Sequence, residues 1–247
     1  MRILGVYNLK GGVGKTATAV NLAFLSAQEG HRTLIWDLDP QAAATFYLRI
    51  KPKIKGGSRK MIQGKRELDG LIKGTDFENL DLLPAEFSYR NMDLILGKRK
   101  KPARQLLRLL RPLSKQFDNI ILDCPPNISL VSENIFRAAD ALLVPNVPGI
   151  LSIRAYHQLL DYLRENRVRG VDVMPFFSMV DRDRHFQMQI IEDMTAENPE
   201  MLSTHIPYAG AVEKMGIRRA PVGEFAPETA AWGAYKALWK EVNQRLY

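Results

Sequence analysis

Apolar residues along the chain form two kinds of pattern. Short continuous runs predict strands at 2–8, 31–40, 80–84, 118–123, 140–145, 171–178 and 203–207. Runs spaced three and four residues apart predict helices over 16–29, 102–117, 130–138, 151–166, 185–197 and 229–246. Because the two kinds alternate from end to end, the pattern predicts an α/β fold. A mostly parallel, twisted sheet would be flanked by helices on both faces, in a single domain over 1–247.

Composition narrows the class of protein. The 247 residues are 46% hydrophobic and 25% charged, which is ordinary for a globular chain. The lone Cys124 excludes a disulfide framework and a four-cysteine metal site, and favours a cytoplasmic location. No apolar run approaches the roughly 18 residues that a membrane span needs. The N-terminal apolar run reaches Lys10 too early for a signal peptide.

Positive charge is concentrated in one part of the chain. The net charge is +8, yet residues 49–115 alone hold 18 Lys and Arg against 7 Asp and Glu. Within it, 49–66 has eight basic residues and no acidic one, with three glycines, and this predicts a mobile surface loop. Such a concentration indicates a polyanionic partner, either nucleic acid or an anionic membrane surface. A solvated face that only aids solubility is the alternative.

A glycine-rich turn, LKGGVGKT, joins the first predicted strand to the first predicted helix. In this context, backbone N–H groups and the helix N-terminus bind phosphate. Lys15 would reach the β- and γ-phosphates, and the Thr16 hydroxyl would ligate Mg²⁺. A strict phosphate-loop pattern has glycine where this chain has Leu9. The predicted nucleotide-binding residues here are Lys10, Gly11, Gly12, Val13, Gly14, Lys15, Thr16 and Ala17.

Three aspartates follow predicted strands. Asp37 and Asp39 end the second strand, and residues two apart on a strand face the same side. Asp123 ends the apolar run NIILD. Ligands of open parallel sheets bind at these strand ends, and Mg²⁺ prefers oxygen ligands. The sequence therefore predicts a site for magnesium and a nucleotide that includes Thr16, Asp37, Asp39 and Asp123.

The segments KGGVGKT, WDLDPQ and ILDCPP resemble those of the ParA/MinD family of deviant Walker A ATPases, which have the P-loop NTPase fold. The resemblance implies ATP and Mg²⁺ as cofactors and a nucleotide-sandwich homodimer, in which Lys10 touches the phosphates bound by the partner. It implies that Asp39 positions the attacking water, that Asp123 holds Mg²⁺ through a water, and that Asp37 lies near the metal. Lys10, Lys15 and Asp39 would be the catalytic residues.

Two departures from the family pattern concern the loops. Residues 39–43 read Asp-Pro-Gln-Ala-Ala where partition proteins usually read Asp-Pro-Gln-Gly-Asn, and Ala17 replaces a usual threonine. Either change could alter loop shape or the rate of hydrolysis. Later segments, SMVDRDRH and IPYAGAVEKMG, resemble the partition branch. Met179, Asp181 and Pro207 in them are the expected contacts of the adenine base.

The resemblance implies a switch that positions DNA or another cargo. The ATP dimer would bind double-stranded DNA without sequence preference, and a ParB-like or cargo-adaptor partner would stimulate hydrolysis and release. The protein would then be cytoplasmic and associated with the nucleoid. Because the first strand begins at residue 2, no helix-turn-helix region is expected. The expected DNA contacts are Lys98, Arg99, Lys100, Lys101, Arg104, Arg182, Arg184, Arg218 and Arg219.

Two other functions stay open. A MinD-like ATPase would bind membrane through an amphipathic C-terminal helix, and 229–246 carries a stripe from Trp232 to Leu246. The same spacing is usual for a terminal helix that docks on the core, which is the interpretation we favour. A metabolic ATPase or ligase of the same fold is the third possibility.

Overall fold

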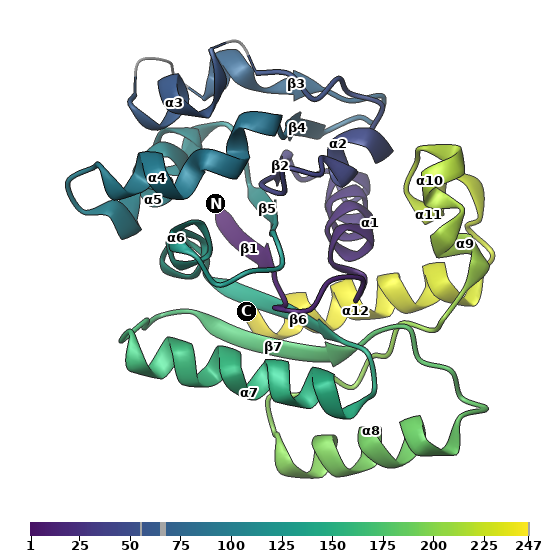
Figure 1. Cartoon of the computed structure of the whole chain (residues 1–247). Helices are drawn as coiled ribbons and strands as arrows, with labels where there is room; N and C mark the ends of the chain where they lie inside the picture. The colour runs from purple at the N-terminus through teal and green to yellow at the C-terminus, as the bar shows by residue number, and fades with distance from the viewer. Residues whose placement is uncertain (55, 65–67, 247) are drawn as a thin grey trace.

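The fold is organised around a seven-stranded sheet in strand order β3-β4-β2-β5-β1-β6-β7 (Figure 1). The computed structural model describes residues 1–54, 56–64 and 68–246. All strand pairs are parallel except β3 with β4 at one edge. The strands are β1 (Arg2–Val6), β2 (Thr33–Asp37), β3 (Lys73–Gly74), β4 (Leu80–Leu83), β5 (Asn119–Asp123), β6 (Ala141–Asn146) and β7 (Asp172–Phe177).

Helices cover both faces of this sheet (Figure 1). One face packs against α1 (Lys15–Gln28), α2 (Ala43–Tyr47), α10 (Met215–Arg218), α11 (Val222–Phe225) and α12 (Ala230–Leu246), with α9 (Gly210–Glu213) beside them. The other packs against α3 (Gly57–Ile62), α4 (Met92–Gly97), α5 (Gln105–Leu110), α6 (Leu130–Ala138), α7 (Ile150–Glu165) and α8 (His185–Glu197). Short 3₁₀ helices lie at η1 (Asp69–Leu71), η2 (Phe87–Asn91), η3 (Pro102–Arg104) and η4 (Arg111–Lys115).

The central strands are apolar along their whole length because both of their faces are covered. Every residue of β2, β5 and β6 is buried. Alternate side chains enter opposite cores: Leu34 and Trp36 of β2 join one cluster, and Ile35 joins the other. This is the pattern of a parallel sheet between two helix layers, and the predicted α/β class is confirmed.

Most predicted elements are present, but the strand predicted at 203–207 is wrong. In that segment the N–H of Ile206 donates to Phe177 O of β7 (2.9 Å), but its strand-type pairing among the described residues is limited to an isolated bridge between Val180 and Pro207. The N–H groups of Ser203 and Thr204 donate to the Glu241 carboxylate of α12 instead of a strand partner, at 2.6 and 2.9 Å. Pro207 has no N–H to donate, so the segment follows the end of β7 without extending the sheet.

Two predictions on the basic stretch need correction. The helix predicted over 102–117 is broken into η3, α5 and η4. Pro112 lacks an N–H, and its ring would clash with the carbonyl of residue 108 in a continuous α-helix. The loop predicted over 49–66 contains α3, which buries Met61 and Ile62 completely. Lys55, Lys65 and Arg66 of that stretch lie outside the described residues.

The C-terminal helix docks on the core. Its apolar stripe is buried against α1 and the neighbouring strands, with Trp232 5% exposed and Tyr235, Leu238, Trp239 and Val242 at most 1% exposed. The indole N–H of Trp239 donates to Glu29 Oε2 at the end of α1 (2.8 Å). The favoured interpretation of this stripe, as a core-packing face, is confirmed. Among the described residues, no helix has the length and apolar character that crossing a bilayer requires.

Candidate nucleotide site

The glycine-rich turn lies at the carboxyl edge of the sheet, between the ends of its central strands. It follows β1, which is flanked by β5 and β6. In the strand register, Val6 pairs with Asp123, and Asp123 pairs with Asp37. The topology therefore brings Lys15, Asp37 and Asp123 to one place, as the sequence predicts, although 86 residues separate the two aspartates along the chain.

Two glycines of the turn have backbone angles that other residues rarely adopt. Gly12 has φ +70° and Gly14 has φ +91°. A Cβ on Gly14 would also lie 2.9 Å from the Ser178 hydroxyl, at the end of β7. Glycine at position 14 is thus required twice, by conformation and by the close approach of another segment.

Lys15, at the first position of α1, is 7% exposed. Its ammonium donates to the carbonyl of Lys10 across the turn (2.9 Å). Burial lowers the pKa of Lys15, while the charges of Asp123 and Asp39 oppose that shift. A buried lysine bonded to a backbone carbonyl of the turn is placed to bind phosphate oxygens.

Two asparagines that we did not predict hold the turn in place. The Asn8 side chain accepts the N–H of Lys10 (2.8 Å) and donates to Pro145 O and Asn146 Oδ1. Asn146 in turn donates to Val144 O. Both asparagines are buried at the carboxyl ends of strands β1 and β6. Their position next to those strand ends is the sequence signal that could have found them.

Asp123 has an unusual environment for a carboxylate. It is fully buried, and neither oxygen has a hydrogen-bond partner of standard geometry among the described residues. Burial raises its pKa well above the usual range, and the negative charge of Asp37 adds to the shift. The Thr16 hydroxyl is close enough to oppose it. An orphaned buried carboxylate beside a threonine hydroxyl is a donor set that fits a divalent cation.

Asp37 is buried too, but its oxygens already have partners. Oδ2 accepts the N–H and the hydroxyl of Thr45 (2.8 and 2.7 Å), and Oδ1 accepts the N–H of Asp39 (3.2 Å). Burial raises its pKa despite these bonds. Asp37 therefore anchors the start of α2, and a role near the metal stays a prediction.

Asp39 lies half-buried in the loop that follows β2. Its Oδ1 accepts the N–H of Gln41 (2.9 Å). Ala42, at the position of the usual family glycine, has φ +56°, a left-handed conformation that costs an alanine free energy. The loop thus keeps the backbone shape that a glycine would adopt more readily.

The carboxylates do not form a preformed cage. No cluster of three or more His, Cys, Asp or Glu side chains suited to a metal is found in the described ranges. Magnesium suits such an arrangement because it is usually bound by one or two carboxylates, with waters and phosphates as the other ligands. Thr16 and Asp123 are the residues that would hold it.

The Lys10 side chain is exposed at the entrance of the turn. Its ammonium forms no hydrogen bond or ion pair with the part of the chain that the structure describes. Its backbone is fixed at both ends, by Asn8 Oδ1 and by the Lys15 ammonium. The backbone of Lys10 is therefore held in place while its side chain stays exposed to solvent.

The segments predicted to contact the base come together. Val180 donates to Ile206 O, and Tyr208 donates to Val180 O (3.0 and 2.9 Å). A cavity of about 500 Å³ is lined by Asp181, Pro207 and His205, among others. Met179, with φ +57°, follows Ser178, which approaches Gly14. Met179 does not line this cavity, and its contact with the base stays a prediction.

The predicted DNA contacts fall into separate groups. Lys98 and Arg99 line a groove beside α4, while Lys100, Lys101 and Arg104 are exposed outside it. Arg182 and Arg184 lie in the loop after β7, and Arg184 pairs with Asp181 (3.1 Å). Arg218 is the last residue of α10 and Arg219 follows it, on the opposite face of the sheet from α4. The guanidinium of Arg219 donates to Phe46 O and stacks 4.6 Å from the ring centre of Phe46.

A mostly parallel sheet, a phosphate loop after a central strand and an orphaned carboxylate at the next strand define a P-loop nucleotide-binding protein. The family model described as an AAA domain, AAA_31, matches residues 1–171. The chromosome partitioning protein ParA of Myxococcus xanthus is 31% identical over 254 residues, covering 99% of this chain and 88% of that protein.

Solved structures are similar to this chain over nearly its whole length. Cobyrinic acid a,c-diamide synthase from Mycobacterium smegmatis, with bound ADP and magnesium, has a TM-score of 0.83 at 25% identity, covering 97% of this chain and 92% of that one. The ATP complex of a Cyanothece McdA variant has a TM-score of 0.86 at 23% identity, covering 98% and 96%. This chain belongs to the ParA/MinD family of P-loop ATPases within the AAA domain family. Family membership assigns ATP and Mg²⁺ as its cofactors.

Proposed function

We propose that this protein is a single-domain ParA-type switch that hydrolyses ATP to ADP and phosphate to position DNA or another large cargo. The observation that supports it most is the pairing of two lysines in one turn. Lys15 is buried at the start of α1, and the Lys10 side chain is exposed with no partner among the described residues. One cation serves the site of its own chain, and the second is placed to serve a site on another copy.

The residues divide the chemistry of hydrolysis among themselves. Backbone N–H groups of the turn and Lys15 would bind the phosphates, and Thr16 with Asp123 would hold magnesium, which would supply positive charge to the transferred phosphoryl group. Asp39 orients the attacking water. Lys10 of the second copy adds a cation to the same phosphates, as an arginine finger does in other P-loop proteins.

Exposed apolar side chains beside the turn support a dimer. Ile150 and Leu151 are 61% and 65% exposed at the start of α7. They follow β6 closely, and Asn146 at the end of β6 contacts Asn8 below the turn. Exposed apolar groups near a binding site are typical of an interface with a partner, and these two follow the strand end that contacts the segment before the turn.

The ATP dimer would bind double-stranded DNA through basic groups that each copy presents. Lys100, Lys101 and Arg104 are the contacts that the exposed positions favour most, together with Arg182, Arg184 and Arg218. Two weakly binding faces held in one dimer bind far more tightly than one, which lets the nucleotide state control DNA affinity. A ParB-like or cargo-adaptor protein would stimulate hydrolysis, and the protein would be found in the cytoplasm on the nucleoid.

DNA retention tests the switch directly. Wild-type protein should be retained on a random-sequence duplex with ATP, released with ADP, and retained poorly in either state when Lys10 is changed to alanine. The logarithm of the affinity should fall by about 0.9 per phosphate contact for each tenfold rise in salt. Equal retention in all three conditions would exclude the switch, and rapid hydrolysis without DNA or partner would favour a metabolic ATPase.

A further inference from the structure

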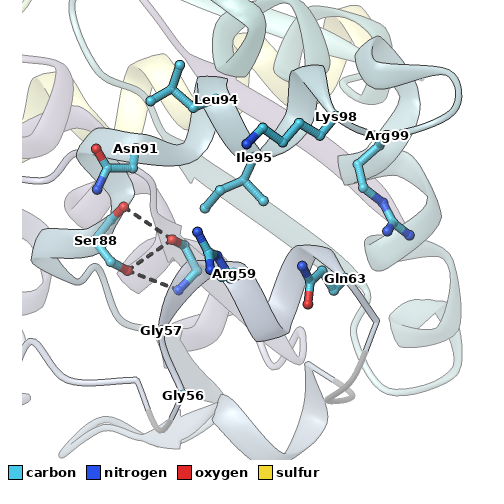
Figure 2. Close-up of a pocket in the computed structure, with 11 residues that line it drawn as sticks. Gly56, Gly57, Arg59, Gln63, Ser88, Asn91, Leu94, Ile95, Lys98 and Arg99 are labelled. Atoms are coloured by element: carbon cyan, nitrogen blue, oxygen red, sulfur yellow. Dashed lines mark hydrogen bonds between the residues drawn. The ribbon is translucent and has the colours of Figure 1, made fainter.

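A groove beside α4 takes no part in the proposed hydrolysis, although two of its residues, Lys98 and Arg99, are among the predicted DNA contacts. It lies between α3 on one side and η2 with α4 on the other, and its volume is about 700 Å³ (Figure 2). We call it the α3–α4 groove; Arg59, Gln63, Ser88, Leu94, Lys98 and Arg99 are among the residues that line it. In Figure 2, Arg59 and Gln63 lie opposite the side chains of α4.

The two walls of the groove are joined by a closed set of hydrogen bonds. The Ser88 hydroxyl accepts the N–H of Ser58 and donates to its hydroxyl (both 3.0 Å), and the Ser58 hydroxyl donates to Ser88 O (3.1 Å) (Figure 2). Ser58 is fully buried. The groove is therefore a fixed feature of this face, held where α3 meets η2.

The groove carries an excess of positive charge. Arg59, Lys98 and Arg99 line it, and none of its described lining residues is acidic, although the Glu86 carboxylate lies behind Gly57 on one wall. The side chains of these three form no hydrogen bond or ion pair with the described part of the chain. Three cations without a partner among the described residues, around one concave surface, favour a ligand that carries carboxylates or phosphates.

The same surface also carries apolar side chains, and these distinguish a ligand with carboxylates from one with phosphates. Leu94 is 70% exposed on the groove wall, and Ile95 lies beside it (Figure 2). On η2, Phe87 is 66% exposed with Arg90 stacked 3.9 Å from its ring centre. A duplex backbone offers nothing to cover such side chains, whereas a peptide offers apolar and acidic groups together.

The groove wall is connected to the strand that carries the site aspartates. The indole N–H of Trp36, next to Asp37, donates to the Tyr89 hydroxyl of η2 (3.2 Å). The N–H of Ala85 donates to the Thr45 hydroxyl (2.9 Å), which itself donates to Asp37. A ligand that moves η2 would act on β2 and on the loop that holds Asp39.

We propose that the α3–α4 groove is the docking site for an acidic, apolar peptide segment of the protein that regulates the ATPase. The role of that segment as a regulator rests on the proposed function, but docking does not, since none of the described lining residues belongs to the nucleotide site. Lys98 and Arg99 then belong to this peptide site, and the DNA contacts lie elsewhere.

Selection from a phage-displayed library of random linear peptides tests the docking, with and without ATP. Sequences retained by wild-type protein should combine an apolar anchor with several Asp or Glu residues. Anisotropy of the labelled peptides should show binding weakened about tenfold or more by Arg59→Glu with Arg99→Glu, and also weakened by Leu94→Ser. The matched control, Arg111→Glu with Lys115→Glu, makes the same change of charge outside the groove and should weaken binding less than about threefold.

Three results would overturn the proposal. The first is that the selected peptides are basic. The second is that both double variants weaken peptide binding equally. The third is that the groove variant, relative to the control variant, weakens binding of a random-sequence duplex as much as it weakens binding of the peptides. Light scattering adds a fourth: if the groove variant alone abolishes self-association, the groove is an interface between copies. Repeating the selection on Lys10→Ala separates the inferences, because docking should survive there even if the ATP switch does not.

Tyr89→Phe then tests the connection to the site. It removes the acceptor of the Trp36 indole N–H without changing the groove lining. Selected peptides should bind it with wild-type affinity but change its ATP hydrolysis rate less than they change that of wild type. Equal effects on both rates would show that the bound segment does not act through η2.

Discussion

At the scale of single residues, the nucleotide site buries the carboxyl group of Asp123 away from water, which disfavours its charged form. The folded chain holds a proton on Asp123 to higher pH than the unfolded chain, so the carboxylate costs stability as pH rises from its unfolded pKa through its folded pKa. Asp123→Asn should therefore stabilise the nucleotide-free protein by about 2 kcal/mol near neutral pH. The gain should vanish below about pH 4. Urea unfolding at the two pH values measures it.

Asp118→Asn is the control with the opposite sign. The Arg32 guanidinium lowers the pKa of exposed Asp118 to about 2, so its ion pair stabilises the protein above the unfolded pKa and stops doing so as pH falls through about 2. This variant should be less stable than wild type near neutral pH. If Asp123→Asn also loses stability at neutral pH, the buried carboxylate does not destabilise the folded protein, and the donor set for magnesium must be reconsidered.

A second residue-scale prediction concerns Ala42, whose φ is +56°. A left-handed conformation costs an L-residue about 1–2 kcal/mol, and part of the relief is offset by the greater freedom of glycine in the unfolded chain. Ala42→Gly should thus stabilise the protein by about 0.5–1 kcal/mol. Chemical denaturation measures this gain. Ala43→Gly, one residue later in the helical region, should lose stability, and a loss in both variants would contradict the strain.

At the scale of elements, the apolar pattern of the sequence predicts those strands and helices whose own burial determines where they lie. The strands ending at Asp37 and Asp123 are fully buried, so their apolar runs identify them, and parallel order then brings the site carboxylates together. Elements of four to six residues, such as α3, are too short to show a period. Others depend on a distant partner: Glu241 takes the N–H groups that a strand at 203–207 would have used. Asn8 and Thr45 act through contacts that no local pattern contains.

Helix α5 depends on such a distant partner. Asn134 of α6 accepts the N–H groups of Gln105 and Leu106 (2.7 and 3.1 Å) and donates to Pro102 O and Leu130 O (both 2.8 Å). Asn134→Ala leaves buried N–H groups unpaired at the start of α5 and should cost about 2–4 kcal/mol. Denaturation measures the loss, and hydrogen exchange should speed up at residues 105 and 106.

The variant Asn134→Asp is the graded control for that prediction. It keeps an acceptor for the two N–H groups but gives up both donated bonds. It should lose less stability than the alanine variant and keep slow exchange at residues 105 and 106. If the two variants lose equally, the asparagine stabilises α6 through its donated bonds and does not cap α5.

At the scale of the whole molecule, the proposed dimer needs the edge of the sheet where the turn lies. Leu151→Glu puts a charge where the second copy would bury an apolar side chain, so ATP should no longer shift the protein to a dimer in light scattering. Binding of a fluorescent ATP analogue to the monomer should persist, because Leu151 is no part of the phosphate turn. Ile217→Glu is the matched control: Ile217 is 82% exposed, but it lies on α10, which packs on α2 on the opposite face of the sheet from α7. A dimer that survives Leu151→Glu, or is lost equally in Ile217→Glu, would place the interface on another face and leave Lys10 without a second site to serve.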